Sequence, residues 1–313
     1  MNVKKIKSAI EDIQNGKFLI VTDDADRENE GDLIMASEMI TPEAVNFMAK
    51  HARGLICISI NKNDANRLSL EPMEQKNTSL HETNFTVSVD AVANTTTGIS
   101  AHDRAQTIRL MVDEKSSPAD FARPGHIFPI IAKDGGVLRR SGHTEASMDL
   151  AQLAGFKPSG VLCEIMAEDG SMLRGEDLLS FAKHHDLKLI SISDLIAYVR
   201  INKNLVEKIE TVRFPTEYGE FHLHLYQDKF EDKQHLALTY GKVETNEPIL
   251  TRVHSECVTG DIFSSSRCDC GKQLEYAMKT IVENGSGVII YLKQEGRGIG
   301  LKHKIKAYKL QDE

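Results

Sequence analysis

The chain has 313 residues, more than one hydrophobic core usually supports, so we expect two domains. Its formal net charge of −8 argues against a nucleic-acid binder, because phosphate contacts require a basic surface. An odd number of cysteines, five, favours a reducing compartment, and no apolar run approaches a membrane span, so we expect a cytoplasmic protein without a membrane partner.

Strand and helix patterns alternate along the first two thirds of the chain. Apolar residues at helical spacing predict a helix over residues 4–15, followed by a buried strand over 18–21. Thr41 and Pro42 are typical of a helix N-cap and first-turn proline. Without a regular repeat, this half is predicted to be α+β, with a mixed sheet and packed helices. Further strands are predicted over 54–60, 85–90 and 160–166, and further helices over 103–113, 145–154 and 175–185.

A domain boundary is expected near residues 200–212, where the apolar pattern gives way to the polar linker segment INKNLVEKIE. The next residues, FPTEYGEFHLHLYQ, are typical of a hairpin that turns near Gly219. We therefore predict one domain over residues 1–203 and a second over 204–313.

The most distinctive segment of the first domain is VTDDADRENEGDL, residues 21–33, in which carboxylates crowd a loop after a buried strand. Like charges this close repel one another unless a cation neutralises them. The loop therefore suggests a hard divalent cation bound through oxygen, with a solvated acidic turn as the alternative.

Three further segments carry side chains that complement this loop. RPGHIFP is expected to place His126 on a turn, and RRSGHTEA places Arg140 just ahead of a helix, where it is suited to an anion. VLCEI places Glu164 inside a predicted core strand. Each has an ordinary alternative: a hydrogen-bonded turn histidine, a surface charge, or the solvent-facing position of an edge strand. Together they suit the enolisation of a phosphorylated sugar, with His126 and Glu164 moving protons.

The segments DDADRENEGD, TTTGISAHDRA, RPGHIFP, GHTEA and LAGFKPSGVLCEIM resemble 3,4-dihydroxy-2-butanone 4-phosphate synthase of riboflavin biosynthesis, in the same order and over about residues 5–200. The resemblance implies a lyase that converts ribulose 5-phosphate to 3,4-dihydroxy-2-butanone 4-phosphate and formate. It also implies Mg²⁺, with Mn²⁺ as the alternative, and a homodimer with sites at the subunit interface.

The resemblance assigns roles position by position. The metal ligands are Glu28 and His143, and the residues essential for catalysis are His126 and Glu164. The substrate contacts are Arg27, Glu28, Asp32, Arg140, Ser141, Gly142, His143, Thr144 and Glu164. Ser141 is a departure, because many relatives have glycine there; a small residue should still admit the sugar.

The second domain carries three closely spaced cysteines in RVHSECVTGDIFSSSRCDCGKQLE. Cys257, Cys268 and Cys270 would leave one position open on a tetrahedral Zn²⁺, which is how catalytic zinc sites admit a reactive water. The alternative is a structural zinc site completed by His254 or a remote residue.

The segments RVHSE, CDCG, QLE, QEGRGIGL and KAYKLQD resemble GTP cyclohydrolase II, a domain often fused behind the synthase. The resemblance implies that Cys257, Cys268 and Cys270 bind Zn²⁺, whose bound water attacks the imidazole ring of GTP, and that Tyr308 belongs to the active site. The GTP contacts that it implies are Arg252, Val253, His254, Ser255, Glu256, Gln273, Glu295, Gly296 and Arg297.

The sequence ends at Glu313, inside a helix expected to begin at about Gly300. We therefore expect an incomplete α/β zinc-binding domain with little or no GTP turnover. A fully bifunctional enzyme and a non-catalytic zinc-binding scaffold are the alternatives. The run KHKIKAYK is expected to be an exposed lysine-rich helix rather than a nucleic-acid contact.

Overall fold

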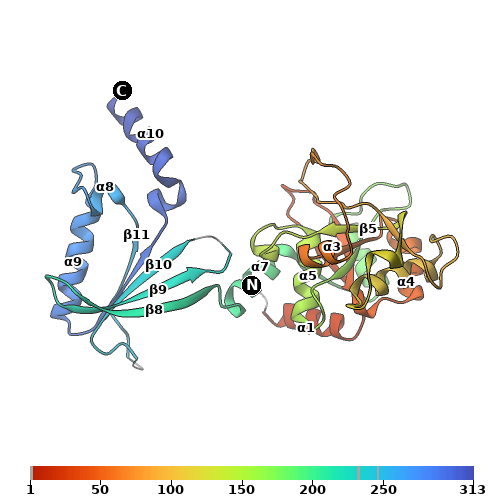
Figure 1. The fold of residues 1–313 in the computed structure, drawn as a ribbon, viewed down its shortest axis with the longest axis horizontal. Coiled ribbons are helices and arrows are strands. Elements are labelled where there is room, and N and C mark those ends of the chain that lie inside the picture. The colour runs from red at the N-terminus through yellow and green to blue at the C-terminus, as the bar shows by residue number, and fades with distance from the viewer. Residues whose placement is uncertain (1–2, 231–232, 245–246) are drawn as a thin grey trace. The chain divides into compact units, whose positions relative to one another are not determined.

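The structure is a computed structural model that describes residues 3–230, 233–244 and 247–313. The chain divides into two compact units, Met1–Lys203 and Asn204–Glu313 (Figure 1). Within the described part of the chain, no helix is both long and apolar enough to cross a membrane.

The first unit is built on a seven-stranded mixed sheet with the order β4-β5-β3-β6-β2-β1-β7. β1 pairs with β7 and β3 with β5 in parallel, and the remaining neighbours are antiparallel. The α+β class predicted from the sequence is therefore confirmed. The strands are β1 (Leu19–Thr22), β2 (Gly31–Ala36), β3 (Cys57–Ile60), β4 (Val89–Ala91), β5 (Phe121–Ile131), β6 (Gly160–Glu164) and β7 (Lys188–Ser191).

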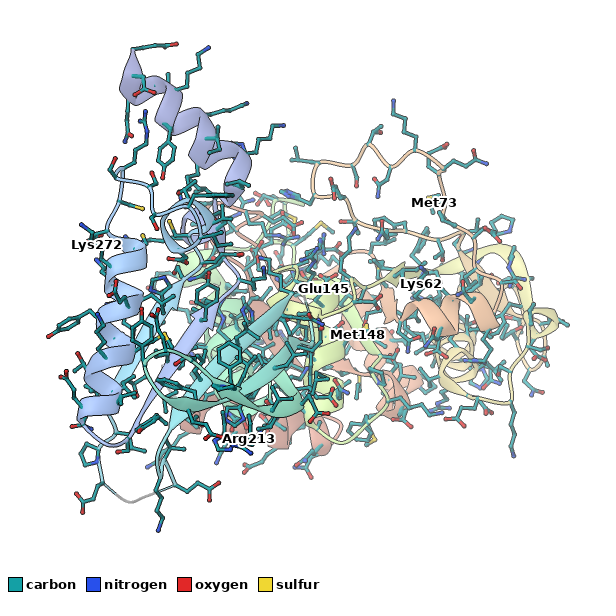
Figure 2. The ribbon with its side chains drawn as sticks, turned by 60° about the vertical axis from the view of Figure 1, so that its left-hand side comes forward. Lys62, Met73, Glu145, Met148, Arg213 and Lys272 are labelled. Atoms are coloured by element: carbon teal, nitrogen blue, oxygen red, sulfur yellow. The ribbon has the colours of Figure 1, made fainter. Side chains whose placement is uncertain are left out.

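Helices cover both faces of this sheet, which explains why its central strands β2, β3 and β6 are buried almost throughout. Successive side chains of a strand point to opposite faces. Ile20 accordingly packs in one core with α2, α3, α4 and α6, while Leu19 and Val21 pack in the other with α1, α5 and α7. Figure 2 labels Glu145 and Met148 on α5 and Lys62 on α3. The helices are α1 (Val3–Gln14), α2 (Pro42–Phe47), α3 (Lys62–Arg67), α4 (Ala101–Val112), α5 (His143–Leu153), α6 (Gly175–His184) and α7 (Ile192–Asn202), with short turns η1 (Ser37–Met39), η2 (Met48–Ala52), η3 (Pro118–Asp120) and η4 (Gly136–Leu138).

The second unit has a five-stranded sheet with the order β11-β12-β10-β9-β8. Helix α9 packs on it through Ala277 and Ile281, which share a small core with Phe221, Leu238 and Ile289. Helix α10 buries none of its described residues. The elements are β8 (Val206–Pro215), β9 (Glu220–Asp228), β10 (Gln234–Tyr240), β11 (Thr251–Ser255), α8 (Val258–Asp261), α9 (Cys270–Glu283), β12 (Gly287–Leu292), η5 (Glu295–Gly298) and α10 (Gly300–Asp312).

Two local predictions are wrong. Residues 206–210, expected to be linker, open strand β8, which lies at the edge of its sheet and therefore tolerates the charges of this segment. His126 lies inside the 11-residue strand β5, not on a turn. At its neighbour Gly125 a Cβ atom would lie 2.0 Å from the Val89 carbonyl carbon, beside a register shift of the β4–β5 pair. Glycine here permits close backbone approach at a bulge, a signal that resembles a turn in sequence.

Two strand predictions need shortening. The predicted strand over 54–60 begins only at Cys57, and over 85–90 the regular strand β4 begins only at Val89, with isolated bridges at Phe85 and Thr86. The helices predicted over 103–113, 145–154 and 175–185 are confirmed as α4, α5 and α6, each within two residues.

Candidate functional site

The acidic loop connects β1 to β2 and is held in shape by its own first carboxylate. Asp23 Oδ2 accepts hydrogen bonds from the backbone N–H of Glu28 at 3.0 Å and from Arg27 Nη1 at 2.9 Å, and Asp23 Oδ1 accepts one from the Glu30 N–H at 2.9 Å. Antiparallel pairing of the two strands sets Val21 opposite Asp32. The hairpin thus presents Glu28 and Asp32 at the same end of the sheet.

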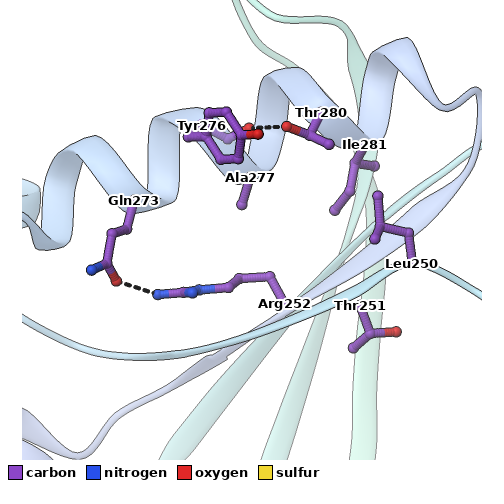
Figure 3. A pocket seen from close by; sticks show the side chains of 8 residues that line it. All are labelled: Leu250, Thr251, Arg252, Gln273, Tyr276, Ala277, Thr280 and Ile281. Atoms are coloured by element: carbon purple, nitrogen blue, oxygen red, sulfur yellow. Dashed lines mark hydrogen bonds between the residues drawn. The ribbon is translucent and has the colours of Figure 1, made fainter.

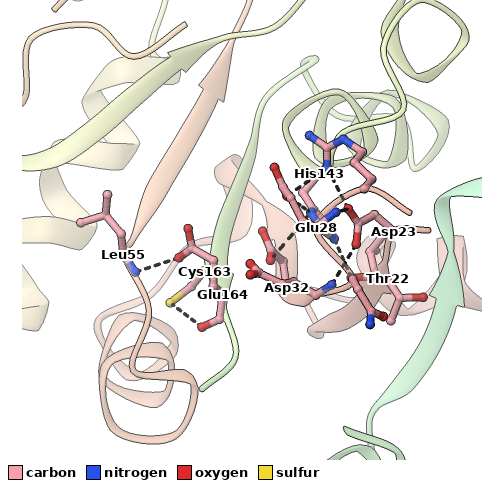
Figure 4. Close-up of polar contacts among 12 residues, drawn as sticks. Thr22, Asp23, Glu28, Asp32, Leu55, His143, Cys163 and Glu164 are labelled. Atoms are coloured by element: carbon pink, nitrogen blue, oxygen red, sulfur yellow. Dashed lines mark hydrogen bonds and ion pairs between the residues drawn. The ribbon is translucent and has the colours of Figure 1, made fainter. Parts of the chain in front are cut away.

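His143, the first residue of α5, meets these carboxylates from the other side (Figure 4). Its Nδ1 lies 3.6 Å from Glu28 Oε2 and 3.9 Å from Asp32 Oδ1, while its Nε2 donates to the Val21 carbonyl at 3.1 Å. A backbone acceptor on one ring nitrogen fixes the tautomer and leaves the other for a metal. Potential ligand atoms of Asp23, Glu28 and His143 lie within 4.8 Å of one another.

The electrostatics of this cluster favour a bound cation. A hydrogen bond from His143, reinforced by the Arg27 guanidinium, lowers the pKa of Glu28 to about 2. Burial raises the pKa of Asp32, and nearby carboxylates raise it further, although His143 opposes them. Asp32 Oδ1 is buried without a hydrogen-bond partner among the described residues. A divalent cation would satisfy this oxygen and relieve the repulsion, so the residues present fit such an ion.

Glu164 is the last residue of β6 and lies opposite Asp32 in the β2–β6 pair. Its Oε2 accepts a hydrogen bond from the Leu55 N–H at 2.8 Å (Figure 4). Because β6 lies between β2 and β3, the alternative of an edge-strand position is wrong. The structure therefore places Glu164 beside Asp32, whose Oδ1 lies 3.9 Å from His143 Nδ1.

Arg140 connects the α5 N-terminus to the loop at residues 81–83. Its Nη2 donates to the His81 carbonyl at 3.0 Å and to Thr83 Oγ1 at 3.1 Å, and its Nη1 pairs with Glu145 Oε2 at 2.7 Å. At Gly142 a Cβ atom would lie 2.3 Å from Arg140 Nη1, so glycine makes room for the guanidinium. Sequence reasoning did not find the role of buried Glu145 in holding Arg140.

The remaining members of this motif lie at the same helix end. Ser141 is exposed and precedes the N-cap Gly142, whereas Thr144 is buried in the first turn of α5. Free backbone N–H groups of this turn are suited to an anion.

His126 lies on β5, which β3 and β6 separate from β2 of the acidic hairpin. Asp90 Oδ1 accepts a hydrogen bond from the His126 N–H at 2.8 Å, and Asp90 Oδ2 accepts one from its Nδ1 at 2.7 Å. Among the described residues, no hydrogen bond or ion pair joins His126 to Glu28, His143 or Glu164. Sequence reasoning missed Asp90, whose only signal was a carboxylate at the end of a predicted strand.

The three cysteines of the second unit converge between β11, α8 and α9. The sulfur atoms of Cys257, Cys268 and Cys270 lie within 4.8 Å of one another, with 3.6 Å between the first two. At Gly260 a Cβ atom would lie 2.7 Å from Cys268 Sγ, so a side chain here would crowd the sulfur cluster. His254 Nε2 instead donates to Asp261 Oδ1 at 3.1 Å, and His254 is not part of the cluster. The donor set fits Zn²⁺ with an open fourth position.

A cavity of about 650 Å³ opens beside these cysteines. Nine GTP contacts are expected from the sequence, and all of them except Glu295 line this cavity. The eight lining residues are Arg252, Val253, His254, Ser255, Glu256, Gln273, Gly296 and Arg297. Glu295 accepts hydrogen bonds from the Val258 N–H and from Lys304 instead. A smaller cavity of about 210 Å³ lies between α9 and β11, where Arg252 bonds Gln273 and Tyr276 lines the wall (Figure 3).

One expectation for the lysine-rich helix is wrong. Lys302, Lys306 and Lys309 are exposed, but the Lys304 side chain is only 12% exposed. Its Nζ donates to Glu295 Oε1 at 2.6 Å and to Cys257 Sγ at 2.9 Å. Anionic partners from other elements draw this lysine inward, which a charge run in sequence does not reveal.

Comparisons with known proteins agree with both resemblances. The profile of the 3,4-dihydroxy-2-butanone 4-phosphate synthase family matches residues 7–198, and that of the GTP cyclohydrolase II family matches residues 207–313. Riboflavin biosynthesis protein RibBA of Bacillus cereus is 57% identical over 309 residues, which cover 99% of this chain and 78% of the relative. The corresponding protein of Bacillus mycoides is 55% identical over the same shares.

Two solved structures are also similar. RibBX, a two domain 3,4-dihydroxy-2-butanone 4-phosphate synthase from A. baumannii, is 37% identical with a TM-score of 0.72, covering 98% of this chain and 90% of its own. A synthase in complex with two magnesium ions is 42% identical with a TM-score of 0.60, covering 63% of this chain and 97% of its own. The chain therefore belongs to the family of riboflavin biosynthesis proteins in which a 3,4-dihydroxy-2-butanone 4-phosphate synthase domain precedes a GTP cyclohydrolase II domain.

Proposed function

We propose that the first unit converts ribulose 5-phosphate to 3,4-dihydroxy-2-butanone 4-phosphate and formate at the Glu28–His143–Glu164 cluster. The observation that carries this proposal is the buried Asp32 Oδ1, which has no hydrogen-bond partner among the described residues and lies among carboxylates that face His143 Nδ1. Glu28 and His143 would hold Mg²⁺, the ion in the related synthase structure, and Mn²⁺ would accept the same ligands.

The side chains divide the chemistry among them. The reaction begins with removal of a proton beside the sugar's ketone, which builds negative charge on adjacent oxygen atoms. Mg²⁺ held there would supply Lewis-acid stabilisation of that charge. Glu164 is fixed through Oε2 by Leu55, and no hydrogen bond among the described residues uses its Oε1, which leaves that atom to accept a proton.

Arg27, Arg140 and the first turn of α5 offer donors for the substrate's phosphate and hydroxyl groups. Arg140 contacts Thr83, and His81 lies 4.0 Å from Glu28, so the loop at 81–83 connects the proposed phosphate end to the metal end. We assign Arg140 and Thr144 to the phosphate because guanidinium and backbone N–H groups both donate to its oxygens. Asp32, Ser141 and Gly142 would border the sugar.

We also propose a homodimer in which His126 of a second copy completes the site. This proposal is supported by the separation of His126 from the acidic cluster within one chain. Asp90 accepts the hydrogen bond from His126 Nδ1, so Nε2 is the ring nitrogen that can exchange a proton with substrate. His126 is partly exposed and accessible to a second copy, with 42% of its side chain open.

Subunit complementation tests this arrangement. His126→Ala and Glu164→Gln should each release little formate from ribulose 5-phosphate. If the two residues meet across an interface, unfolding and refolding the mixed chains should restore about a quarter of wild-type activity, because half of the dimers are mixed and one of their two sites is intact. Mixed chains that are no more active than their parents would refute the shared site. Full activity in either variant alone would refute the catalytic assignment of that residue.

The second candidate function is GTP hydrolysis to the diaminopyrimidine precursor, formate and pyrophosphate. Cys257, Cys268 and Cys270 would hold Zn²⁺, and the adjoining cavity would hold GTP. The earlier expectation of little turnover rested on where the sequence ends, whereas the family match and the assembled cavity favour the bifunctional alternative over a scaffold. GTP-dependent formate release that is lost in Cys268→Ser and kept in the synthase variant Glu164→Gln would support it.

A further inference from the structure

Helix α10 contacts the cysteine cluster through polar side chains. Lys304, Tyr308 and Asp312 recur at four-residue spacing, so they lie on one face of the helix. Tyr308 Oη lies 3.1 Å from Thr259 Oγ1, and both carboxylate oxygens of Asp312 accept hydrogen bonds from Arg267 Nη2, at 2.6 and 2.7 Å. Because α10 buries no described residue, these contacts rather than an apolar core hold this face in place.

Lys304 is the member of this face nearest the cluster. Its Nζ donates to Cys257 Sγ at 2.9 Å and to Glu295 Oε1 at 2.6 Å. Glu295 Oε2 in turn accepts the Val258 N–H at 2.8 Å, so the same carboxylate also holds the residue that follows Cys257. Lys304 therefore contacts both the Cys257 thiolate and the Glu295 carboxylate that holds the backbone next to Cys257.

The charges of the cluster give Lys304 a specific task. Three thiolates exceed the charge of one Zn²⁺ by one negative charge, so an ammonium group against Cys257 Sγ stabilises the bound state, although the same ammonium also pairs with Glu295. Hydrogen-bond donors to a ligand also fix its orientation, and removing such outer partners typically lowers metal affinity 10–100-fold. Charge and geometry both point to the metal site rather than to general helix stability.

We infer that Lys304 is a positioning residue of the three-cysteine site, which orients Cys257 through its ammonium group and strengthens Zn²⁺ binding. The inference rests on the zinc site proposed above and adds a residue outside its ligand set. Nothing in the sequence distinguishes Lys304 from the neighbouring lysines of α10; its contacts do.

Competition with a chromogenic chelator measures Zn²⁺ affinity in the full chain. Lys304→Met should raise the dissociation constant about 10–100-fold, whereas Lys306→Met, a matched change of an exposed lysine on the same helix, should leave it unchanged. Lys304→Arg should recover part of the affinity, because guanidinium keeps the charge and the donors. In the Co²⁺-substituted chain, the thiolate-to-cobalt absorption band should shift in Lys304→Met and not in Lys306→Met.

The outcomes separate this inference from the proposal beneath it. Wild-type affinity and an unshifted cobalt band in Lys304→Met would overturn the role of Lys304 and leave the zinc site standing. A wild-type chain that binds neither Zn²⁺ nor Co²⁺ would overturn both. If Lys304→Met does not fold, Lys304→Gln, which keeps a donor without the charge, provides the same comparison.

Discussion

Replacing Asp90 by asparagine tests how His126 is held ready for proton transfer. In the native chain the two carboxylate oxygens accept the His126 backbone N–H at 2.8 Å and its Nδ1–H at 2.7 Å. An asparagine can keep the first bond through its carbonyl oxygen, but its amide nitrogen then faces Nδ1 and requires a ring acceptor there. The proton moves to Nε2, the atom that we expect to exchange protons with substrate.

The expected magnitude follows from the step that is lost. A positioned general acid or base contributes about 10²–10⁴-fold to rate, equivalent to about 3–5 kcal/mol in activation free energy. Because the ring remains in place, the loss should appear mainly in kcat rather than KM. Steady-state formate release measures both parameters.

The control for this variant is Asp134→Asn, which neutralises an exposed carboxylate outside the site. Asp134→Asn should release formate at the wild-type rate. Both Asp90→Asn and Asp134→Asn should keep the wild-type melting temperature. Full wild-type kcat in a folded Asp90→Asn protein would show that catalysis does not depend on the His126 tautomer that Asp90 holds, and the reasoning would fail.

Three further predictions concern stability. Gly125→Ala should lower the free energy of unfolding by about 1–3 kcal/mol, since its Cβ would lie 2.0 Å from the Val89 carbonyl carbon; urea denaturation measures the loss. The folded pKa of Glu28, about 2, lies below its ordinary 4.5, so its contribution to stability is complete above the ordinary value and is lost as pH falls toward 2. Metal-free wild type should therefore lose more stability than Glu28→Gln on acidification over this window, and parallel curves from acid titrations would contradict this. Mg²⁺ should raise the melting temperature of the wild type, EDTA should reverse the effect, and Glu28→Gln should show little response.

The order of elements in the first unit could be predicted from sequence because local signals agreed with the final packing. The Ile spacing of α1 and the Thr41 N-cap, whose side chain accepts the Ala44 N–H, act over single turns. Failures arose where a local signal had two explanations. Pro124 and Gly125 suggested a turn but occupy a bulged strand, and the charges of β8 suggested a linker but lie on an edge strand.

The candidate sites show the same limit at longer range. Motifs identified Glu28, His143 and the three cysteines, because each stands in a distinctive local context. Partners contributed by distant elements could not be recognised from the sequence, because Asp90 precedes His126 by 36 residues and Lys304 follows Cys257 by 47. Only the folded chain sets these partners side by side.

Formate release followed by proton NMR tests the central claim most directly. The purified chain would be incubated with Mg²⁺ and Zn²⁺, with ribulose 5-phosphate in one tube and GTP in another. We predict formate from ribulose 5-phosphate that disappears with EDTA, while the GTP tube reports separately on the second unit. A folded, metal-loaded dimer that releases no formate from ribulose 5-phosphate would contradict the proposed synthase site.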